Sequence, residues 1–200
     1  MVENTISSLK ESETDFKFNI ILVESSGLKL DAGQNHLIKY DQKRFSYNRA
    51  LNLGALASQN DWLVFANNDL VFHRGWFSEI ARQHENNSSI VSFTPWNRWN
   101  GWHDNYFPNN TKELRLGYNI CRELGGWCIA VKRSIFDTID LSERCSLWYS
   151  DNIYADALMQ YGYIHALACH SFVDHLTSQT IDYNNYKINL DRDIYLEGKT

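Results

Sequence analysis

The chain has 200 residues and a mass of 23.4 kDa, the size of a single domain that buries roughly 70% of the surface of its unfolded chain. Hydrophobic residues make up 44% and charged residues 22% of the sequence, a balance that excludes a disordered protein. The formal net charge is -5 and no block of basic residues stands out, which argues against nucleic acid as a partner because that binding needs a cationic surface.

Three local features bear on where the protein works. Residues 1–6 show no cationic stretch followed by an apolar one, so no signal peptide is expected. No run of about 18 apolar residues occurs, so no transmembrane segment is expected either. We therefore expect a soluble, cytoplasmic protein. Its four cysteines form no C-x-x-C pair and are expected to be reduced thiols in the core: Cys121, Cys128, Cys145 and Cys169.

The apolar pattern alternates between strand-like and helix-like segments. Residues 95–124 are polar, rich in Asn and Trp and without a period, which predicts a long functional loop. The tail from 181 to 200 either wraps the surface or stays loose. In chain order we expect a helix at 2–9, strands at 18–23 and 36–40, a helix at 46–57, a strand at 62–66, a helix at 76–81, strands at 90–93 and 127–131, helices at 134–139 and 151–161, and strands at 164–168 and 172–173.

This alternation predicts a single α/β domain over residues 1–200, with a mostly parallel sheet covered by helices on both faces. Such sheets bind ligands at the carboxyl ends of their strands. Two predicted strands end in polar residues, Glu24-Ser25-Ser26 and Asn67-Asn68-Asp69. A carboxylate at such an end cannot pack into the core and is placed to hold a hard cation, although an isolated Asn-Asn-Asp more often forms an Asx-turn.

The context of Asn67-Asn68-Asp69 resembles a known family. Residues 45–54, with Asn52-Leu53-Gly54 in a predicted helix, lead through the strand at 62–66 to this triplet and then to Gly75-Trp76. This order resembles the family 2-like glycosyltransferases of the GT-A fold, in which a helix carrying N-x-G precedes a strand that ends in the D-x-D-type metal motif. The family usually opens with a central strand before the first helix. The resemblance implies a Rossmann-like GT-A sheet without that strand, which either lies upstream or is replaced by another segment.

The resemblance also implies which residues bind the metal and the donor. Asp69, the one carboxylate in the triplet, is implied as a ligand of Mn2+ or Mg2+. His175, in a segment that resembles the family's terminal H-x-x-S, completes the metal shell, although without the resemblance it would be taken for a structural histidine. The implied donor is a nucleoside diphosphate sugar, UDP-linked by family habit. The residues implied to bind it are Glu24, Ser25, Arg49, Asn52, Asn67, Asn68 and Gly126.

Asp151 is the implied catalytic base. The segment from Trp148 to Asn152 matches that of the family's E-D pair, with Ser150 in place of the first acid. Asp151 would take the proton of the acceptor hydroxyl as the hydroxyl oxygen attacks the anomeric carbon, so the transfer would invert that centre. Taken alone, Asp151 is an equally good candidate for the N-cap of the helix that follows.

Tryptophans supply the candidate acceptor site. Residues 95–104 hold three of them, beside Asn, Asp and His side chains that can hydrogen-bond a sugar. Indole rings can stack on the apolar faces of sugars, but Trp more often packs, here as a lid or small core. The candidates for binding a saccharide acceptor are Trp96, Trp99, Trp102 and Trp127.

Together these residues predict a metal-dependent inverting glycosyltransferase of the hexosyltransferase type. A carbohydrate-binding module is one alternative, with the Trp-rich loop as its only functional site. A catalytically inactive relative of the GT-A fold is another, favoured by the unmatched first strand and by Ser150. A nucleotidyltransferase would need a Gly-rich phosphate loop, which this sequence does not offer.

Overall fold

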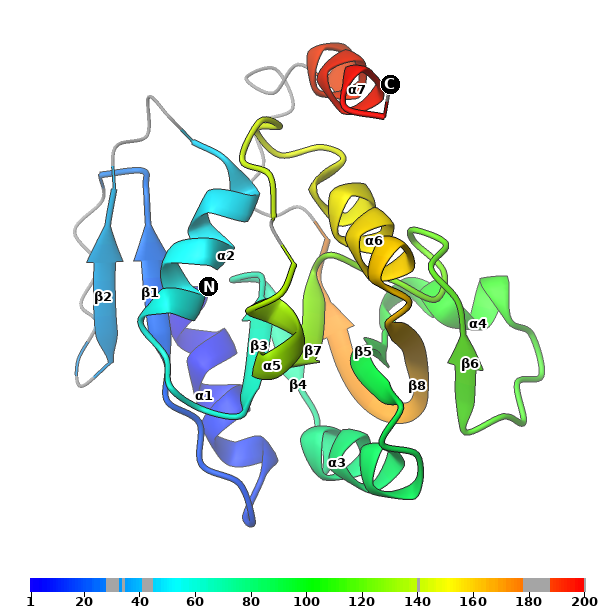
Figure 1. The fold of residues 1–200 in the computed structure, drawn as a ribbon. Helices are drawn as coiled ribbons and strands as arrows, with labels where there is room; N and C mark the ends of the chain where they lie inside the picture. Colours follow the sequence, from blue (N-terminus) through cyan, green and yellow to red (C-terminus); the bar gives the residue numbers. More distant parts are fainter. Residues whose placement is uncertain (28–32, 34, 41–44, 140, 178–187, 200) are drawn as a thin grey trace.

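The computed structural model describes residues 1–27, 33, 35–40, 45–139, 141–177 and 188–199 (Figure 1). In this part of the chain helices and strands alternate, and the strands form two sheets that stand side by side. The elements in chain order are α1 (Val2–Ser12), β1 (Ile21–Glu24), β2 (His36–Lys39), α2 (Tyr47–Leu56), β3 (Trp62–Ala66), β4 (Leu70–Phe72), α3 (Trp76–Asn86), β5 (Ile90–Trp96), the 3-10 helix η2 (Trp99–Gly101), α4 (Trp102–Tyr106), β6 (Leu114–Leu116), β7 (Cys128–Lys132), α5 (Arg133–Phe136), α6 (Ser150–Tyr161), β8 (Ile164–His175) and α7 (Ile188–Glu197).

The larger sheet has the strand order β3-β7-β5-β8-β4, and β6 pairs with β8 beside this path. β5 and β8 are parallel, whereas β7 is antiparallel to both of its neighbours, β3 and β5. β4 and β6 are also antiparallel to β8. The α/β prediction is confirmed, but the larger sheet is mixed rather than mostly parallel. The segment between β5 and β7 holds only short helices and β6, and so it does not form the helical crossover that a parallel neighbour requires.

β8 is a bent strand that joins two parts of the sheet (Figure 1). Its first part pairs with β5, and its last three residues pair with β4. Between Pro95/Ala168 and Trp96/Phe172 the register shifts, which marks an irregularity of the kind that bends a strand. The two short strands expected at 164–168 and 172–173 are therefore one strand. Its bend carries His175 to the beginning of β4, opposite Leu70.

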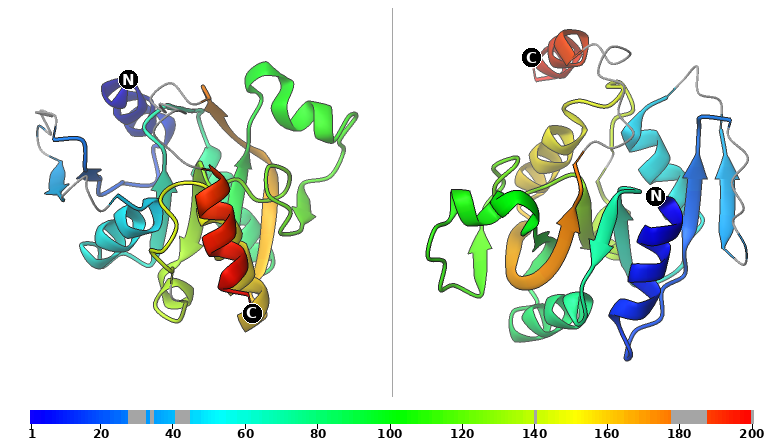
Figure 2. Two further views of the ribbon diagram at one scale, coloured as in Figure 1. Left: turned by 90° about the horizontal axis from the view of Figure 1, so that it is seen from above. Right: turned by 180° about the vertical axis from the view of Figure 1, so that it is seen from behind.

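Helices cover both faces of the larger sheet (Figure 2). One core cluster joins side chains of α2, α5 and α6 to one face, and a second joins α1 and α3 to the other. β7 contributes apolar side chains to both faces of the sheet. Ile129 and Val131 belong to the first cluster, and Cys128 and Ala130 belong to the second. Side chains alternate between the faces of a strand, so a strand that is covered on both sides reads as a continuous apolar run.

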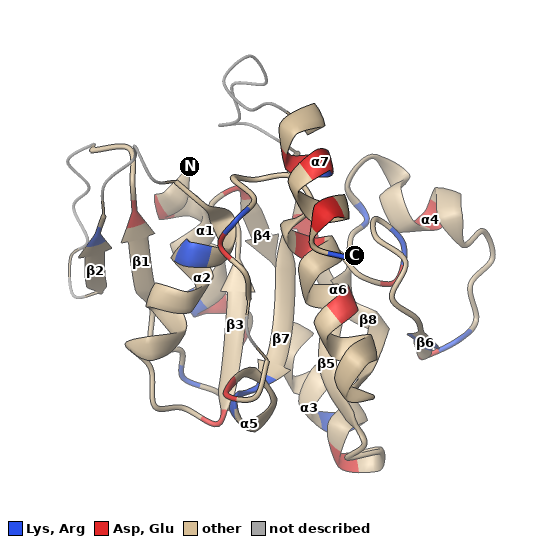
Figure 3. Ribbon diagram, turned by 45° about the horizontal axis from the view of Figure 1, so that its top comes forward, with Lys and Arg blue, Asp and Glu red and all other residues tan. Residues whose placement is uncertain are grey.

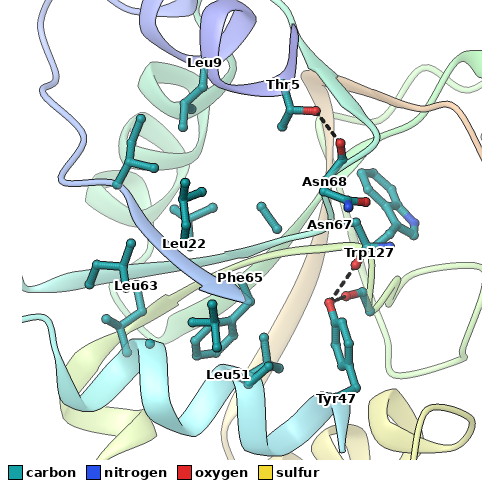
Figure 4. Close-up of a pocket in the computed structure, with 18 of the residues that line it drawn as sticks. Thr5, Leu9, Leu22, Tyr47, Leu51, Leu63, Phe65, Asn67, Asn68 and Trp127 are labelled. Atoms are coloured by element: carbon teal, nitrogen blue, oxygen red, sulfur yellow. Dashed lines mark hydrogen bonds between the residues drawn. The ribbon is translucent and has the colours of Figure 1, made fainter. Parts of the chain in front are cut away.

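β1 and β2 form a separate parallel pair, with Ile21 opposite His36. In the described part of the chain no strand pairs with β1 on its other side, and β3 pairs with β7 alone. The first strand that the resemblance expects is thus not found among the described residues. α1 and α2 lie on opposite sides of the space between β1 and β3 (Figure 4).

The stretches without a clear period contain more structure than expected. The predicted loop at 95–124 holds the end of β5, two short helices and β6, and the tail forms α7, while 181–187 lie outside the described residues. All four cysteines are free, three are buried as expected, and Cys121 is exposed. No helix in the described ranges combines the length and the apolar character needed to cross a membrane.

Candidate active site

A cavity of about 1,200 Å³ lies between β1 and β3 and continues to the carboxyl ends of both strands (Figure 4). Its apolar part is lined from α1, β1, α2 and β3 by residues that include Leu9, Leu22, Leu51, Leu63 and Phe65. Its polar part is lined by Glu24 to Ser26, Asn67 to Asp69, Gly125 to Trp127, Trp148 to Asp151, and His175. The cavity therefore gathers both polar strand ends that were singled out in the sequence.

The turn Asn67-Asn68-Asp69 is held by backbone bonds to its neighbours. The Asn67 N–H donates to the Trp127 carbonyl at 2.9 Å, and the Leu176 N–H donates to the Asp69 carbonyl at 3.0 Å. From α1, the Thr5 hydroxyl lies 2.9 Å from the Asn68 carbonyl oxygen and accepts the Leu70 N–H at 3.1 Å. These bonds fix the backbone and with it the directions of the Asn67 and Asp69 side chains.

The side chains of Asp69 and His175, the two candidate metal ligands, lie next to each other. The Nε2 atom of His175 lies 3.3 Å from Oδ1 of Asp69, because the β4–β8 register sets His175 beside the start of β4. Asp69 is only 3% exposed. The ring of Trp127 stacks on the imidazole with centroids 5.5 Å apart and 11° between the planes, which fixes the orientation of His175. The pair thus offers one carboxylate and one imidazole at the edge of the cavity.

This pair fits a divalent cation that is shared with a bound phosphate. Carboxylate and imidazole suit Mn2+, and Mg2+ is commonly held by one or two carboxylates together with substrate phosphates and water. In the described ranges no group of three or more His, Cys, Asp or Glu side chains is placed to hold a metal ion. Among the described residues, Asp69 and His175 are therefore the pair that could hold a cation together with oxygen atoms from a bound ligand.

Tyr47, in the first turn of α2, fixes the position of Asn67. Its hydroxyl lies 2.8 Å from Oδ1 of Asn67 and 2.9 Å from the Gly126 carbonyl oxygen (Figure 4). Burial raises the pKa of Tyr47 above its ordinary value, and nearby Cys128, Asp151 and Asp69 raise it further. Tyr47 therefore remains a protonated donor at neutral pH. It ties the end of β3 to the Gly125-Gly126 turn.

Asp151 lies in the first turn of α6 and faces the same cavity. The N-cap of this helix is Tyr149, with φ of 64°, and Asp151 is not the N-cap. Burial raises the pKa of Asp151, while the backbone N–H groups of Asn152, Asp151 and Gly126 partly offset this effect. A Cβ atom on Gly126 would lie 2.9 Å from the Asp151 Cβ, so only glycine leaves room for the carboxylate here.

The remaining residues expected to bind the donor divide into two groups. Glu24, Ser25, Asn68 and Gly126 line the cavity, although the Glu24 carboxylate already accepts the backbone N–H of Ser26. Arg49 and Asn52 are not among the lining residues, and the structure does not bring them to the site. They lie on another face of α2, where the Arg49 guanidinium stacks over the ring of Tyr40 and the Asn52 amide donates to the Leu141 carbonyl and to Glu143.

The four tryptophans expected at the acceptor site also separate. Trp102 and Trp127 line the cavity, and the Trp102 indole N–H donates to the Cys121 carbonyl at 3.1 Å. Trp96 is 4% exposed and packs between His103 and Phe107, away from the cavity. Trp99 is 41% exposed and does not line the cavity. The structure thus brings two of the four candidate rings, Trp102 and Trp127, to the cavity and leaves Trp96 and Trp99 outside it.

Three further residues shape the site and were not predicted to do so. Tyr47 holds Asn67, Trp148 lines the cavity, and Cys121, with φ of 65°, accepts the Trp102 indole N–H at its carbonyl. Tyr47 and Trp148 stand within the segments that carry the family resemblance. Their place in these segments indicates that they lie near the site, but the direction of each side chain depends on tertiary contacts.

The fold is shared with solved structures. The crystal structure of GalNAc-T7 with UDP, GalNAc and Mn2+ matches with a TM-score of 0.63 and 11% identity over 90% of this chain and 42% of that chain. A crystal structure of a mycobacterial protein matches with a TM-score of 0.58 and 14% identity over 90% of this chain and 65% of that one. The chain thus spans less than two thirds of either structure, and at these identities the likeness concerns the fold, which is GT-A.

Sequence comparison gives the family. No curated protein matches the chain. The pattern of glycosyl transferase family 2 matches residues 1–140, which include the polar turn after β3 and the Gly125-Gly126 turn. This match covers more than half of the sequence, and the GT-A fold agrees with it. The chain therefore belongs to glycosyl transferase family 2.

Proposed function

We propose that this domain transfers a sugar from a UDP-linked donor to a hydroxyl group of a saccharide, with inversion at the anomeric carbon. The observation that carries the proposal is the meeting of Asp69, His175 and Asp151 at one cavity, from two strand ends and a helix N-terminus. Membership of glycosyl transferase family 2 supports the class of reaction. The GalNAc-T7 structure with UDP and Mn2+ supports the class of donor.

Asp69 and His175 are the residues that would hold a divalent cation, Mn2+ or Mg2+. The cation would offset the negative charge that grows on the leaving diphosphate. A unit charge pair about 4 Å apart is worth ~4 kcal/mol at an effective dielectric constant of about 20, so this contribution is large. Asn67, held by Tyr47 and next to His175, would hydrogen-bond the donor's ribose or phosphate.

Asp151 would act as the general base. It would take the proton of the acceptor hydroxyl as the hydroxyl oxygen bonds to the anomeric carbon. The bond between that carbon and the diphosphate oxygen breaks, and its electron pair leaves with the diphosphate. Burial raises the pKa of Asp151, which makes the carboxylate a stronger base, while its position in the first turn of α6 favours the anionic form.

Trp102 and Trp127 are the proposed acceptor contacts. Both line the cavity that holds Asp151, and each ring is fixed, Trp102 through its bond to the Cys121 carbonyl and Trp127 by its stack on His175. A sugar held by these rings would bring a hydroxyl toward Asp151. Trp96 and Trp99 have no place in this proposal, because neither lines the cavity.

The proposal is tested by assaying the whole chain with UDP-sugars and saccharide acceptors, with Mn2+ and then with the metal chelated. We expect turnover only with metal, and a product whose anomeric configuration, read by NMR, is opposite to that of the donor. Asp137→Asn is the control for carboxylate substitutions, because Asp137 is exposed and pairs only with Arg133 among the described contacts. Metal-independent sugar binding without turnover would favour a carbohydrate-binding domain instead.

A further inference from the structure

The C-terminal helix α7 places a buried carboxylate against the segment that precedes Asp151. Asp191 in α7 is 2% exposed. Its Oδ1 accepts the Ser146 N–H at 2.8 Å, and its Oδ2 accepts the Ser146 hydroxyl at 2.7 Å, the Leu147 N–H at 3.1 Å and the Trp148 N–H at 3.0 Å. One side chain thus satisfies three consecutive backbone donors and a hydroxyl.

The hydrogen bonds from residues 146–148 to Asp191 are stronger than ordinary backbone hydrogen bonds because their acceptor is a carboxylate. Residues 146–148 belong to no helix or strand, so their N–H groups have no partner in a regular ladder. Successive N–H groups that converge on one point form an anion-binding concavity, and hydrogen bonds to a carboxylate are stronger than those between neutral groups. Asp191 therefore fixes the backbone of this segment more firmly than packing alone.

The segment held by Asp191 leads directly into the candidate active site. Leu147, Trp148 and Tyr149 line the cavity, and Tyr149 is the N-cap of the helix whose first turn carries Asp151. On its other side the segment is bound by α2, because the Tyr47 N–H donates to the Ser146 carbonyl at 2.7 Å. The segment is thus clamped between α7 and the same Tyr47 that fixes Asn67.

Three further contacts hold α7 and Lys199, which follows it, beside α6 (Figure 2, left). The ring of Tyr195 stacks on that of Tyr149, with centroids 5.1 Å apart and 24° between the planes. The Tyr195 hydroxyl donates to Asp156 of α6 at 2.7 Å, and Lys199 forms an ion pair with Asp156 at 3.1 Å. Acidic residues of α7 and α6 are coloured red in Figure 3. The helix therefore contacts the segment at both ends, through Asp191 at Ser146 and through Tyr195 at Tyr149.

We propose that Asp191 is a positioning residue, which sets the backbone of residues 146–149 and through it the place of Asp151 in the cavity. The catalytic consequence rests on the proposed function, because it assumes that Asp151 is the base. The structural consequence does not, because it concerns only the order of the segment. On this proposal α7 supports the geometry of the candidate active site and is not a peripheral tail.

The test compares Asp191→Asn with Asp193→Asn by amide hydrogen exchange. An amide at position 191 has one acceptor oxygen and must turn its NH2 group toward at least one of the backbone N–H donors. Asp193 is the matched control, on the same helix but exposed and ion-paired with Arg192. We expect exchange at residues 146–149 to be at least about tenfold faster in Asp191→Asn, with β3 and β7 unchanged, and no change in Asp193→Asn. Equal exchange in both variants would overturn the proposal.

A second readout separates this proposal from the proposed function. In a turnover assay Asp191→Asn should lower kcat while the affinity for UDP with Mn2+ stays near the original value, since the Asp69–His175 pair does not depend on α7. Wild-type protein without turnover, combined with the exchange difference, would refute the proposed function and leave the positioning role standing. If Asp191→Asn fails to fold, Tyr195→Ala provides the test, because it loosens the same segment through Tyr149; unchanged exchange at 146–149 there would refute the positioning role.

Discussion

His175 Nε2 and Asp69 Oδ1 lie 3.3 Å apart because the bent end of β8 pairs with the short strand β4. Trp127, the residue that precedes β7, stacks on the same imidazole. Three segments that are far apart in the sequence thus meet at one corner of the cavity. The proposed metal site is formed by these residues, and the first prediction below tests it.

Asp69→Asn should abolish metal-dependent binding of UDP without unfolding the domain. The substitution keeps the size of the side chain but removes the charge that would attract a divalent cation. Calorimetric titration with UDP, with Mn2+ and with the metal chelated, gives the measurement. His170→Ala serves as a histidine control for His175→Ala, since His170 lies on β8 but is exposed. Metal-dependent UDP binding that persists in Asp69→Asn would contradict the metal assignment.

Asp151→Asn should lower kcat by at least about a hundredfold and leave donor binding intact, as removal of a general base does. It should also raise the melting temperature at neutral pH. Burial raises the pKa of Asp151 in the folded protein, so its ionisation opposes folding at any pH above the ordinary carboxyl pKa. The stability gain should therefore shrink as the pH falls through the folded-state pKa of Asp151, and wild-type turnover should decline over the same interval. Thermal melts at several pH values check this sign.

Gly126→Ala should damage the site, whereas Gly54→Ala should not. A Cβ at Gly126 would meet the Asp151 Cβ at 2.9 Å and would displace the carboxylate, while a Cβ at Gly54 would make an ordinary contact of 3.5 Å with Val23. Gly54 lies inside α2, where alanine is favoured over glycine by roughly 0.5–1 kcal/mol. Turnover and melting temperature of the two variants give the comparison, and equal turnover would show that Asp151 tolerates the shift.

Tyr47→Phe should weaken donor binding because it releases Asn67 from the hydroxyl of Tyr47. The expected loss of stability is about 1 kcal/mol for one hydrogen bond. Tyr118→Phe is the matched control, since it removes a hydroxyl that donates to the Tyr163 carbonyl outside the cavity. Denaturant unfolding should show similar losses for both variants, while UDP titration should show weaker binding for Tyr47→Phe alone.

Trp102→Ala should raise the KM for the saccharide acceptor, and Trp99→Ala should leave it unchanged. Trp102 lines the cavity, whereas Trp99 is exposed outside it. Initial rates at varied acceptor concentration and saturating donor measure both values. If Trp99→Ala has the larger effect, the acceptor enters from another side of the loop.

Much of the fold could be predicted from the sequence, because buried strands and amphipathic helices leave a period. The strand β3 has the bounds that its apolar run predicts, since both of its faces are covered. The helix α7 has no such signal, because Ile188, Leu190 and Leu196 are all about half exposed, at 47%, 53% and 51%. Its attachment comes from Asp191 and Tyr195, whose partners are distant in the sequence.

The sequence predicts the site residues whose position follows from the backbone of a motif. It does not predict those whose side-chain direction depends on tertiary contacts. Asp69 and Asp151 follow from positions at a strand end and a helix start. Arg49 and Asn52 belong to a matching helix, but they lie on a face that the sequence pattern does not distinguish from the face lining the cavity. The separation of Trp96 and Trp99 from Trp102 likewise depends on left-handed backbone at Asn100 and Gly101, with φ of 53° and 67°.

The parallel pair β1–β2 is attached to the rest of the domain mainly by side chains. Backbone pairing links the strands of the larger sheet to one another, but among the described residues none connects β1 to β3. Hydrogen exchange should therefore be fastest in β1 and β2, and on heating this pair should detach before the larger sheet melts. Glu24 and Ser25, at the end of β1, line the side of the cavity that we expect to open more easily, and the turn after β3 lines the other side. A nucleotide that contacts both the end of β1 and the turn after β3 would slow the opening of β1. Amide exchange in β1 is therefore the most sensitive measure of ligand binding.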